Sequence, residues 1–144
     1  MAISATRVMS GTFGEVWLNS EHVAEVKAFQ AKDSYSREDI NMTGQLRAGK
    51  KLMSIEGTGS ITMHKVNSRM AVVIHDEIRA GRDPRFTVIT KLDDPDAFGA
   101  ERISFTGVAF DDLTLADWEV GAVGQIEAPF TFEDYEFLDM VAPQ

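Results

Sequence analysis

The segment EGTGSITMHKV, residues 56–66, constrains the fold more than any other stretch of the sequence, because its two sets of side chains differ strictly in character. Successive side chains of a β-strand point to opposite faces, so this period of two predicts a strand with one face toward a core. One predicted face is small and then apolar, and it holds Gly57, Gly59, Ile61 and Met63. The other face is rich in hydroxyl groups and has no large apolar side chain, and it holds Glu56, Thr58, Ser60, Thr62 and His64.

Similar alternation, interrupted by frequent turn signals, extends over most of the 144 residues. We expect about seven strands in all, the other clear ones lying at residues 15–19, 85–92, 102–110, 113–120 and 125–137. Residues 67–81 differ, because their apolar side chains recur at helical spacing and Gly81 can take the left-handed conformation that ends a helix. The predicted class is α+β and mostly β, in a single domain of residues 1–144. We expect two packed antiparallel sheets in a barrel-like sandwich, flanked by one α-helix.

Residues 33–51, DSYSREDINMTGQLRAGKK, are predicted to form a long loop between two strands. The segment is polar, carries charges of both signs and two glycines, and shows no helical period. Most connections in compact domains are short, and loops of this length are usually functional or disordered. We therefore interpret residues 33–51 as a functional excursion from the sheet.

The distribution of charge is more informative than the net charge of −9. Residues 1–92 hold 13 Lys and Arg against 10 Asp and Glu, whereas residues 93–144 hold Arg102 alone against 13 acids. The chain is therefore not expected to coat nucleic acid, because phosphate binding requires clustered Lys and Arg. Two interpretations remain open. The acidic third either serves solubility, or it is complementary to another region of a second copy and favours head-to-tail association.

Residue types that carry catalysis or bind metals do not form a recognisable set. The chain has no Cys, which excludes disulfides, thiolate metal sites and thiol nucleophiles. His22, His64 and His75 lack metal-ligand spacing, and no Ser–His–Asp set or isolated carboxylate pair stands out. We therefore predict no enzyme, no cofactor and no metal site. No apolar run is long enough to cross a bilayer and no signal-peptide pattern opens the chain, so no membrane association and a cytosolic chain are expected.

Several segments, in their order and spacing, resemble a known family. They are SGTFGEVWLN (10–19), EDINMTGQ (38–45) followed by a basic segment, GTGSITMHKVNSRM (57–70), GRDPRFTV (81–88) and APFTFEDYEF (128–137). With the length of the chain, they resemble the tail-tube proteins of contractile-tailed bacteriophages. The resemblance is to the short type found in Gram-positive defective prophages and phage-tail-like bacteriocins.

The resemblance implies a structural subunit of an inner tail tube. In that family subunits form hexameric rings that stack into a hollow tube inside a contractile sheath, and DNA passes through without specific binding. The implied partners are the chain itself, the tail sheath and the baseplate or initiator proteins. The implied location is the inner tube of a virion tail, after a period in the cytoplasm of the bacterial host.

Within such a tube, the polar face of the strand at 56–66 has a use. Lys or Arg in the wall would bind phosphates and slow DNA transit, whereas hydroxyls and carboxylates stay hydrated and do not hold a polyanion. We therefore predict that a polar and acidic channel is lined by Glu56, Thr58, Ser60 and Thr62. A polar face that merely meets solvent in a monomer is the alternative.

The resemblance also implies that the loop at 33–51 reaches the adjacent ring. Its predicted contact residues are Arg37, Glu38, Asp39, Arg47, Lys50 and Lys51. The predicted acidic partners on the next ring are Asp111, Asp112, Asp117 and Glu119. Two other functions stay open at this point: a tube like that of the type VI secretion system, which carries effectors, and a small-ligand-binding β-barrel with an apolar cavity.

Overall fold

The computed structural model describes residues 4–65, 68–112 and 115–141. Two short 3₁₀ helices, Ala5–Arg7 and Gly11–Phe13, precede the sheet. The strands and the helix are β1 (Gly14–Leu18), β2 (Glu21–His22), β3 (Val26–Ile40), β4 (Gly49–His64), α1 (Arg69–Arg79), β5 (Phe86–Leu92), β6 (Glu101–Phe110), β7 (Gln125–Phe132) and β8 (Asp134–Asp139).

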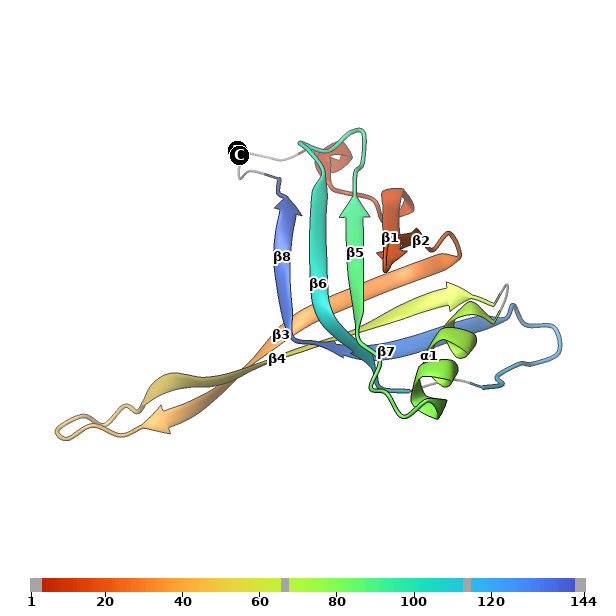
Figure 1. Cartoon of the computed structure of the whole chain (residues 1–144). Coiled ribbons are helices and arrows are strands. Elements are labelled where there is room, and N and C mark those ends of the chain that lie inside the picture. Colours follow the sequence, from red (N-terminus) through yellow and green to blue (C-terminus); the bar gives the residue numbers. More distant parts are fainter. Residues whose placement is uncertain (1–3, 66–67, 113–114, 142–144) are drawn as a thin grey trace.

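The strands form one antiparallel sheet and not two (Figure 1). Its eight strands follow the order β2-β1-β5-β6-β7-β4-β3, and β8 pairs with β6 beside this path. The predicted class, mostly β with one α-helix, is confirmed, but the prediction of two separate packed sheets is wrong. In Figure 1, β1, β5, β6 and β8 run in one direction and β3, β4 and β7 cross them below, so a single sheet is bent over its own core.

The bend lies in β6, at Gly107. Residues 102–106 of β6 pair with β8, whereas Ala109 and Phe110 pair with β7. The register with β5 shifts between Phe86 and Val88, opposite this point, which marks a bulge. Gly107 has φ +64°, a left-handed conformation that glycine adopts without steric cost. Because β6 changes partners across this bulge, the sheet turns a corner and stays continuous instead of separating into two layers.

The core fills the inside of the bend. Val88 and Val108 have no exposed surface, and Phe130 is almost as deeply buried. The ring of Phe105 contacts Phe132 edge to face, with centroids 5.0 Å apart, and so joins the two halves of the sheet. The α1 helix adds Ile74 to the same cluster. Burying this contiguous apolar surface is the main stabilising contribution to the fold.

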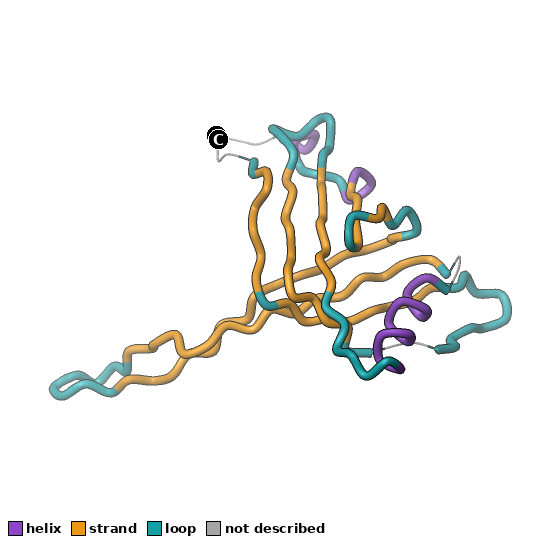
Figure 2. The backbone as a smooth tube through the Cα atoms, in the orientation of Figure 1, coloured by secondary structure: helices purple, strands orange, loops and turns teal. Residues whose placement is uncertain are grey.

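The prediction of a loop over residues 33–51 is wrong. Most of the segment belongs to β3 and β4, which pair from Val26 and Met63 out to Ile40 and Gly49. Beyond Gly57 the hairpin has left the body of the sheet, because β7 pairs with β4 only from Gly57 to His64. We call this projecting part, residues 33–56, the arm; Figure 2 shows it extending far from the rest of the chain, with a loop at its end. Solvent meets both faces of the arm, so its strands need no alternation of polar and apolar residues, and the sequence pattern missed them.

The predicted helix at 67–81 forms over Arg69–Arg79, and its C-terminal signal is confirmed by Gly81 at φ +78°. Asn67, one of its two expected caps, lies outside the described residues, and the side chain of Ser68 makes no capping hydrogen bond. Arg82 donates from Nε and Nη2 to the Glu77 carboxylate, at 2.6 and 3.1 Å, and this hydrogen bonding lowers the pKa of Glu77. Among the described residues, no helix combines the length and the apolar character that crossing a membrane requires.

Candidate functional site

The polar face predicted from residues 56–66 exists in the structure. Gly57, Ile61 and Met63 of β4 are buried toward the core, while the alternate side chains lie on the opposite face. On that face Thr58, Ser60 and Thr62 are half-buried and Glu56 is exposed. The alternation therefore separates core from surface as the sequence predicted.

Neighbouring strands widen this face to three strands. Residues directly opposite each other in an antiparallel pair lie on one face, so β3 and β7 extend it on either side of β4. From β3 come Lys32, Gln30 and Ala28, which face Thr58, Ser60 and Thr62 in turn. From β7 come Thr131, Pro129 and Glu127, opposite the same three residues. We call this set, together with Glu56, the polar face.

The polar face carries positive charge that the single strand did not reveal. Lys32 is exposed beside Thr58. At the end of the sheet near His64, Lys27 donates from Nζ to the Gln125 side-chain oxygen at 3.2 Å and so spans from β3 to β7. Glu56 and Glu127 supply the carboxylates. The face is therefore polar and of mixed charge, and a sequence pattern read along one strand cannot show what adjacent strands contribute.

Two glycines on the core side of β4 leave room for aromatic rings. A Cβ atom at Gly57 would lie within 2.6 Å of three ring atoms of Phe132. A Cβ atom at Gly59 would lie 2.6 Å from Cζ of Phe130 and still closer to the carbonyl oxygen of Gln30 in β3. Both glycines are required by this close approach, because φ is not positive at either. The small end of the predicted inner face is thus the seat of two core phenylalanines.

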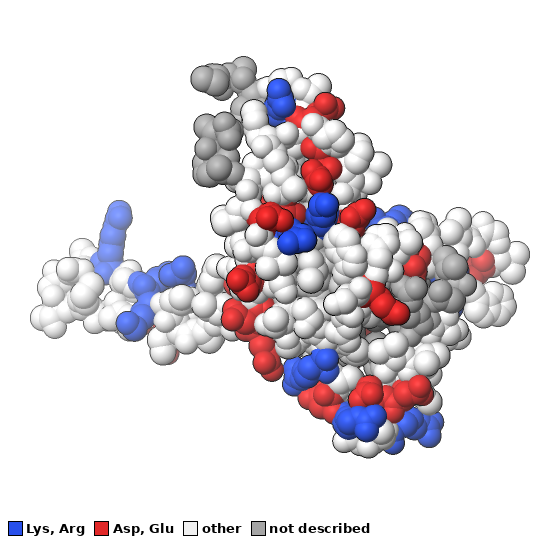
Figure 3. All heavy atoms as spheres, turned by 45° about the horizontal axis from the view of Figure 1, so that its top comes forward, with Lys and Arg blue, Asp and Glu red and all other residues white. Residues whose placement is uncertain are grey.

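The arm carries all six of the predicted contact residues, and all six are exposed. Figure 3 shows the Lys and Arg side chains along it. Lys50 forms an ion pair with Asp39 across the hairpin, and Glu38 stands opposite Lys51 in the register. Arg37 faces Leu52, and Arg47 lies in the loop at residues 41–48. Half of the predicted charges therefore face a partner within the arm itself.

The predicted acidic partners lie far from the arm within one copy. Asp111, Asp112, Asp117 and Glu119 are all exposed. They belong to the segment between β6 and β7, at the opposite end of the molecule in Figure 1. The predicted strand at 113–120 is wrong, since residues 115–119 have no regular structure, while Leu113 and Thr114 lie outside the described residues. Pairing between these acids and the arm is possible only between copies.

One buried carboxylate was not predicted from the sequence. Asp94 is 6% exposed, and its two oxygens accept hydrogen bonds from the backbone N–H groups of Ser10 and Asp96, each at 2.9 Å. Arg7 adds a hydrogen bond to the Asp96 carbonyl oxygen and stacks over the Phe98 ring. The predicted solvated hairpin loop at 93–101 is therefore a fastening for the segment that precedes β1.

Replacing Asp94 with alanine is expected to lower the free energy of unfolding by about 1–3 kcal/mol, because two backbone donors lose their acceptor in a buried place. Urea denaturation followed by circular dichroism measures the loss. Asp96→Ala is the matched control, since its own side chain is exposed, and we expect a change within about 0.5 kcal/mol. Equal stability of the two variants would contradict the role given to Asp94.

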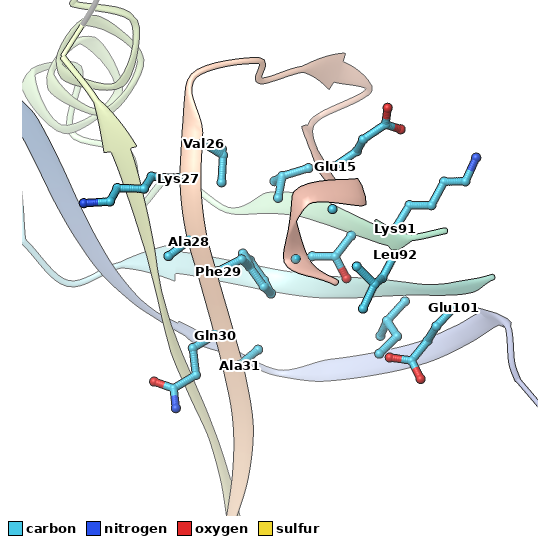
Figure 4. Close-up of a pocket in the computed structure, with 15 residues that line it drawn as sticks. Glu15, Val26, Lys27, Ala28, Phe29, Gln30, Ala31, Lys91, Leu92 and Glu101 are labelled. Carbon is cyan, nitrogen blue, oxygen red and sulfur yellow. The ribbon is translucent and has the colours of Figure 1, made fainter. Parts of the chain in front are cut away.

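A cleft of about 580 Å³ opens between β3 and the strands β1, β5 and β6 (Figure 4). Val16, Val26, Phe29 and Ile103 give it an apolar floor. Glu15, Lys27, Lys91 and Glu101 also line it. The volume lies in the range that small ligands occupy, but the cleft is an open gap beside the free edge of β3 and is no closed cavity at the centre of a barrel.

In the described part of the chain, no three His, Cys, Asp or Glu side chains gather as they would around a metal ion. The strongest features of the surface are instead the polar face, the arm and the acidic segment. These are means of contact and exclusion, and they supply no nucleophile or general base held in a cleft.

Comparison with known proteins gives a family. A family model described as "Phage tail tube protein" matches residues 1–139. The phage-like element PBSX protein XkdM of Bacillus subtilis is 34% identical over 138 residues, which cover 94% of each chain. The fold is similar to that of a chain in the sheath–tube complex of an extracellular contractile injection system, with a TM-score of 0.70, 8% identity, and 96% and 100% of the two chains covered. A chain in the six-fold symmetrised baseplate of the anti-feeding prophage gives a TM-score of 0.62 at 10% identity, over 87% and 90% of the chains.

Proposed function

Because the chain belongs to the phage tail tube protein family, and is a structural, non-enzymatic subunit of the tail tube of contractile phage-like particles, we propose that its copies close into hexameric rings and that the rings stack into a hollow tube. The polar face lines the channel. The single observation that carries this arrangement is the position of that face: it lies on the outside of the bent sheet, opposite the core, on the three strands that include the longest unpaired edge.

Unpaired sheet edges support ring closure. The strand order ends at β3, whose second edge has no strand partner among the residues that the structure describes. A strand of 15 residues with free N–H and C=O groups is a strong template for pairing with another chain. Closing identical copies into a ring removes this edge, and the neighbouring copy covers the open cleft beside it. The six-fold symmetry of the anti-feeding prophage baseplate, in which a chain of this fold occurs, is the reason for proposing six copies.

The chemistry of the polar face suits a channel for DNA. Thr58, Ser60 and Thr62 hold water and carry no charge that would bind phosphate. The carboxylates of Glu56 and Glu127 repel the polyanion and offset Lys32, while the Lys27 ammonium is held by Gln125. Passage without specific binding follows from this composition. A secretion-type tube that carries effectors is the second candidate, but no feature of the polar face favours it.

The remaining partners of the tube follow from the family. We infer that a sheath surrounds the tube and that a baseplate or initiator protein starts its assembly, since relatives of this fold occur in a sheath–tube complex and in a baseplate. The subunit then spends the time before assembly in the cytoplasm of the bacterial host and ends in the tail of the particle.

Electron microscopy of the purified protein in negative stain tests the proposal directly. Concentrated protein is expected to give rings or hollow tubes with six-fold views along the axis, alone or after addition of fragments of baseplate as seeds. A chain that remains monomeric under both conditions in size-exclusion chromatography with light scattering would contradict it.

Placing lysine in the channel tests which face lines it. Ser60→Lys together with Thr62→Lys is expected to leave tubes intact but to make them retain double-stranded DNA at low salt and release it at high salt, because each added contact with phosphate is sensitive to salt. Co-sedimentation of labelled DNA with tubes measures this. Thr87→Lys, an exposed residue of β5, is the matched control and should retain none. Equal retention by both variants would show that the polar face is not the channel wall.

A further inference from the structure

We propose that the tip of the arm of one copy docks on the acidic segment of a second copy, and that Trp118 is the anchor of this contact. We define the tip as residues 40–51 and the acidic segment as residues 111–124. The inference rests on the proposed function, because it assigns the contact through which tube subunits meet, but it names a contact that involves more than charge.

Large apolar side chains are exposed in the acidic segment to an unusual degree. Trp118 is 81% exposed and Val120 is 90% exposed, and Leu115 and Val123 are exposed at 77% each. Exposed apolar patches on this scale mark surfaces that another molecule covers. Tryptophan is also among the residues that contribute most to binding energy at protein interfaces. No helix or strand forms between Leu115 and Val120, so the segment is free to adapt to a partner.

Charge restricts which partner can cover the segment. Residues 111–124 contain four carboxylates and no Lys or Arg. DNA is excluded as the occupant, because its phosphates would be repelled. A partner must bring both cations and apolar side chains within a short distance of each other.

The tip of the arm has these two properties. Leu46 is fully exposed, and Ile40 and Met42 are exposed at 41% and 48%. Arg47 stands beside Leu46 in the loop, and Lys51 is close by in β4. The guanidinium of Arg47 is the group best suited to lie over the ring of Trp118, since arginine stacks on aromatic faces more readily than lysine does. Lys50 contributes less, because Asp39 already pairs with it.

The two surfaces cannot meet within one copy. The arm projects from one end of the sheet, and the acidic segment lies at the other end beside α1 (Figures 1 and 2). Two different complementary patches at opposite ends of a molecule produce head-to-tail contacts, which repeat from copy to copy. The occupant of the acidic segment is therefore the arm of a second copy of this chain.

Fluorescence of Trp118 tests the contact without removing it. The chain has two tryptophans, and Trp17 is half-buried against His22, so Trp17→Phe leaves Trp118 as the sole reporter. On assembly into tubes, its emission should shift to shorter wavelength and its quenching by acrylamide should fall several-fold. If tubes form and Trp118 stays as open to quenching as in the free subunit, the inference is wrong while the tube function stands. If no tubes form with the unmodified chain, the proposed function itself fails.

Cross-linking identifies the partner surface. The natural chain has no Cys, so Leu46→Cys and Val120→Cys can be made separately and mixed during assembly. Mild oxidation of the mixed tubes should give a covalent dimer that contains one copy of each variant. A mixture of Leu46→Cys with Thr87→Cys, on β5, is the control and should give none. Tubes that yield no cross-link between positions 46 and 120 would overturn the assignment.

Truncation of the anchor gives the expected size of the effect. Trp118→Ala should fold normally, because the side chain touches little of its own copy, but should raise the concentration needed for tube formation by about ten-fold or more. Ile78→Ala removes another side chain that is 60% exposed, from α1, and should leave that concentration unchanged. The same critical concentration for both variants would contradict the role of Trp118.

Discussion

Alanine at Gly59 is expected to destabilise the chain more than any other conservative change, by about 3 kcal/mol or more, and to leave most of it unfolded or insoluble. The new methyl group would meet the carbonyl oxygen of Gln30, the Cα atom of Ala31 at 3.0 Å and the ring of Phe130 at 2.6 Å. The first two belong to the backbone of β3, which is paired to β4 on both sides of this point and cannot retreat. Phe130 is 1% exposed at the centre of the core and has no space to move into.

Urea denaturation measured by circular dichroism and near-ultraviolet absorption gives the loss, or its extent is seen as a failure to recover soluble protein. Gly11→Ala is the matched control, because nothing lies within 4 Å of a Cβ atom at that position. The control should keep the unfolding midpoint of the natural chain. A soluble Gly59→Ala variant with the same midpoint would show that β3 and β4 are not packed as described.

Reversing the charges of Arg47, Lys50 and Lys51 to Glu is expected to abolish tube formation while the subunit stays folded. All three side chains are exposed on the arm, outside the core, so their loss costs little stability. Single exposed ion pairs contribute about 0–1 kcal/mol, but the reversal changes attraction into repulsion toward the acidic segment at every contact of every ring. Electron microscopy in negative stain scores the tubes, and circular dichroism confirms the fold.

The ion pair within the arm supplies a control for this experiment. Exchanging the two members of the pair, with Asp39→Lys and Lys50→Glu, keeps both the pair and the net charge of the arm. This variant should still form tubes, so a loss confined to the triple reversal would locate the effect in the contact between copies. Normal tubes from the triple reversal would eliminate the arm as an electrostatic contact.

The polar face shows how far a one-dimensional pattern can lead. Alternation in β4 predicted which side chains turn inward and which outward, because a core excludes water from one face of a strand and imposes a period of two. It did not predict Lys32, Gln30 or Glu127 on the same face, since those positions depend on which strands pair and in what register. The channel lining remains a prediction for the experiments above.

The arm and Asp94 were missed for opposite reasons. The arm is solvated on both faces, so its strands carry no alternation that a reader of the sequence could detect. Asp94 looks like any acid of a surface turn, and its role depends on Ser10, 84 positions earlier in the chain, which the fold brings within 2.9 Å. The exposed Trp118 was expected in the core or an interface, and only the structure separates it from the half-buried Trp17.

The sequence by itself determined the mostly β class, the position of the helix, the inward and outward faces of β4 and the division into a basic arm and an acidic third. These are local properties, set by side-chain period, capping residues and composition. Only the tertiary structure decided that one sheet bends at Gly107, that the arm is a paired hairpin and that its tip and the acidic segment lie at opposite ends of the molecule. Strand pairing and bending join residues far apart in the chain, and the energies that select them come from contacts that no local window of sequence contains.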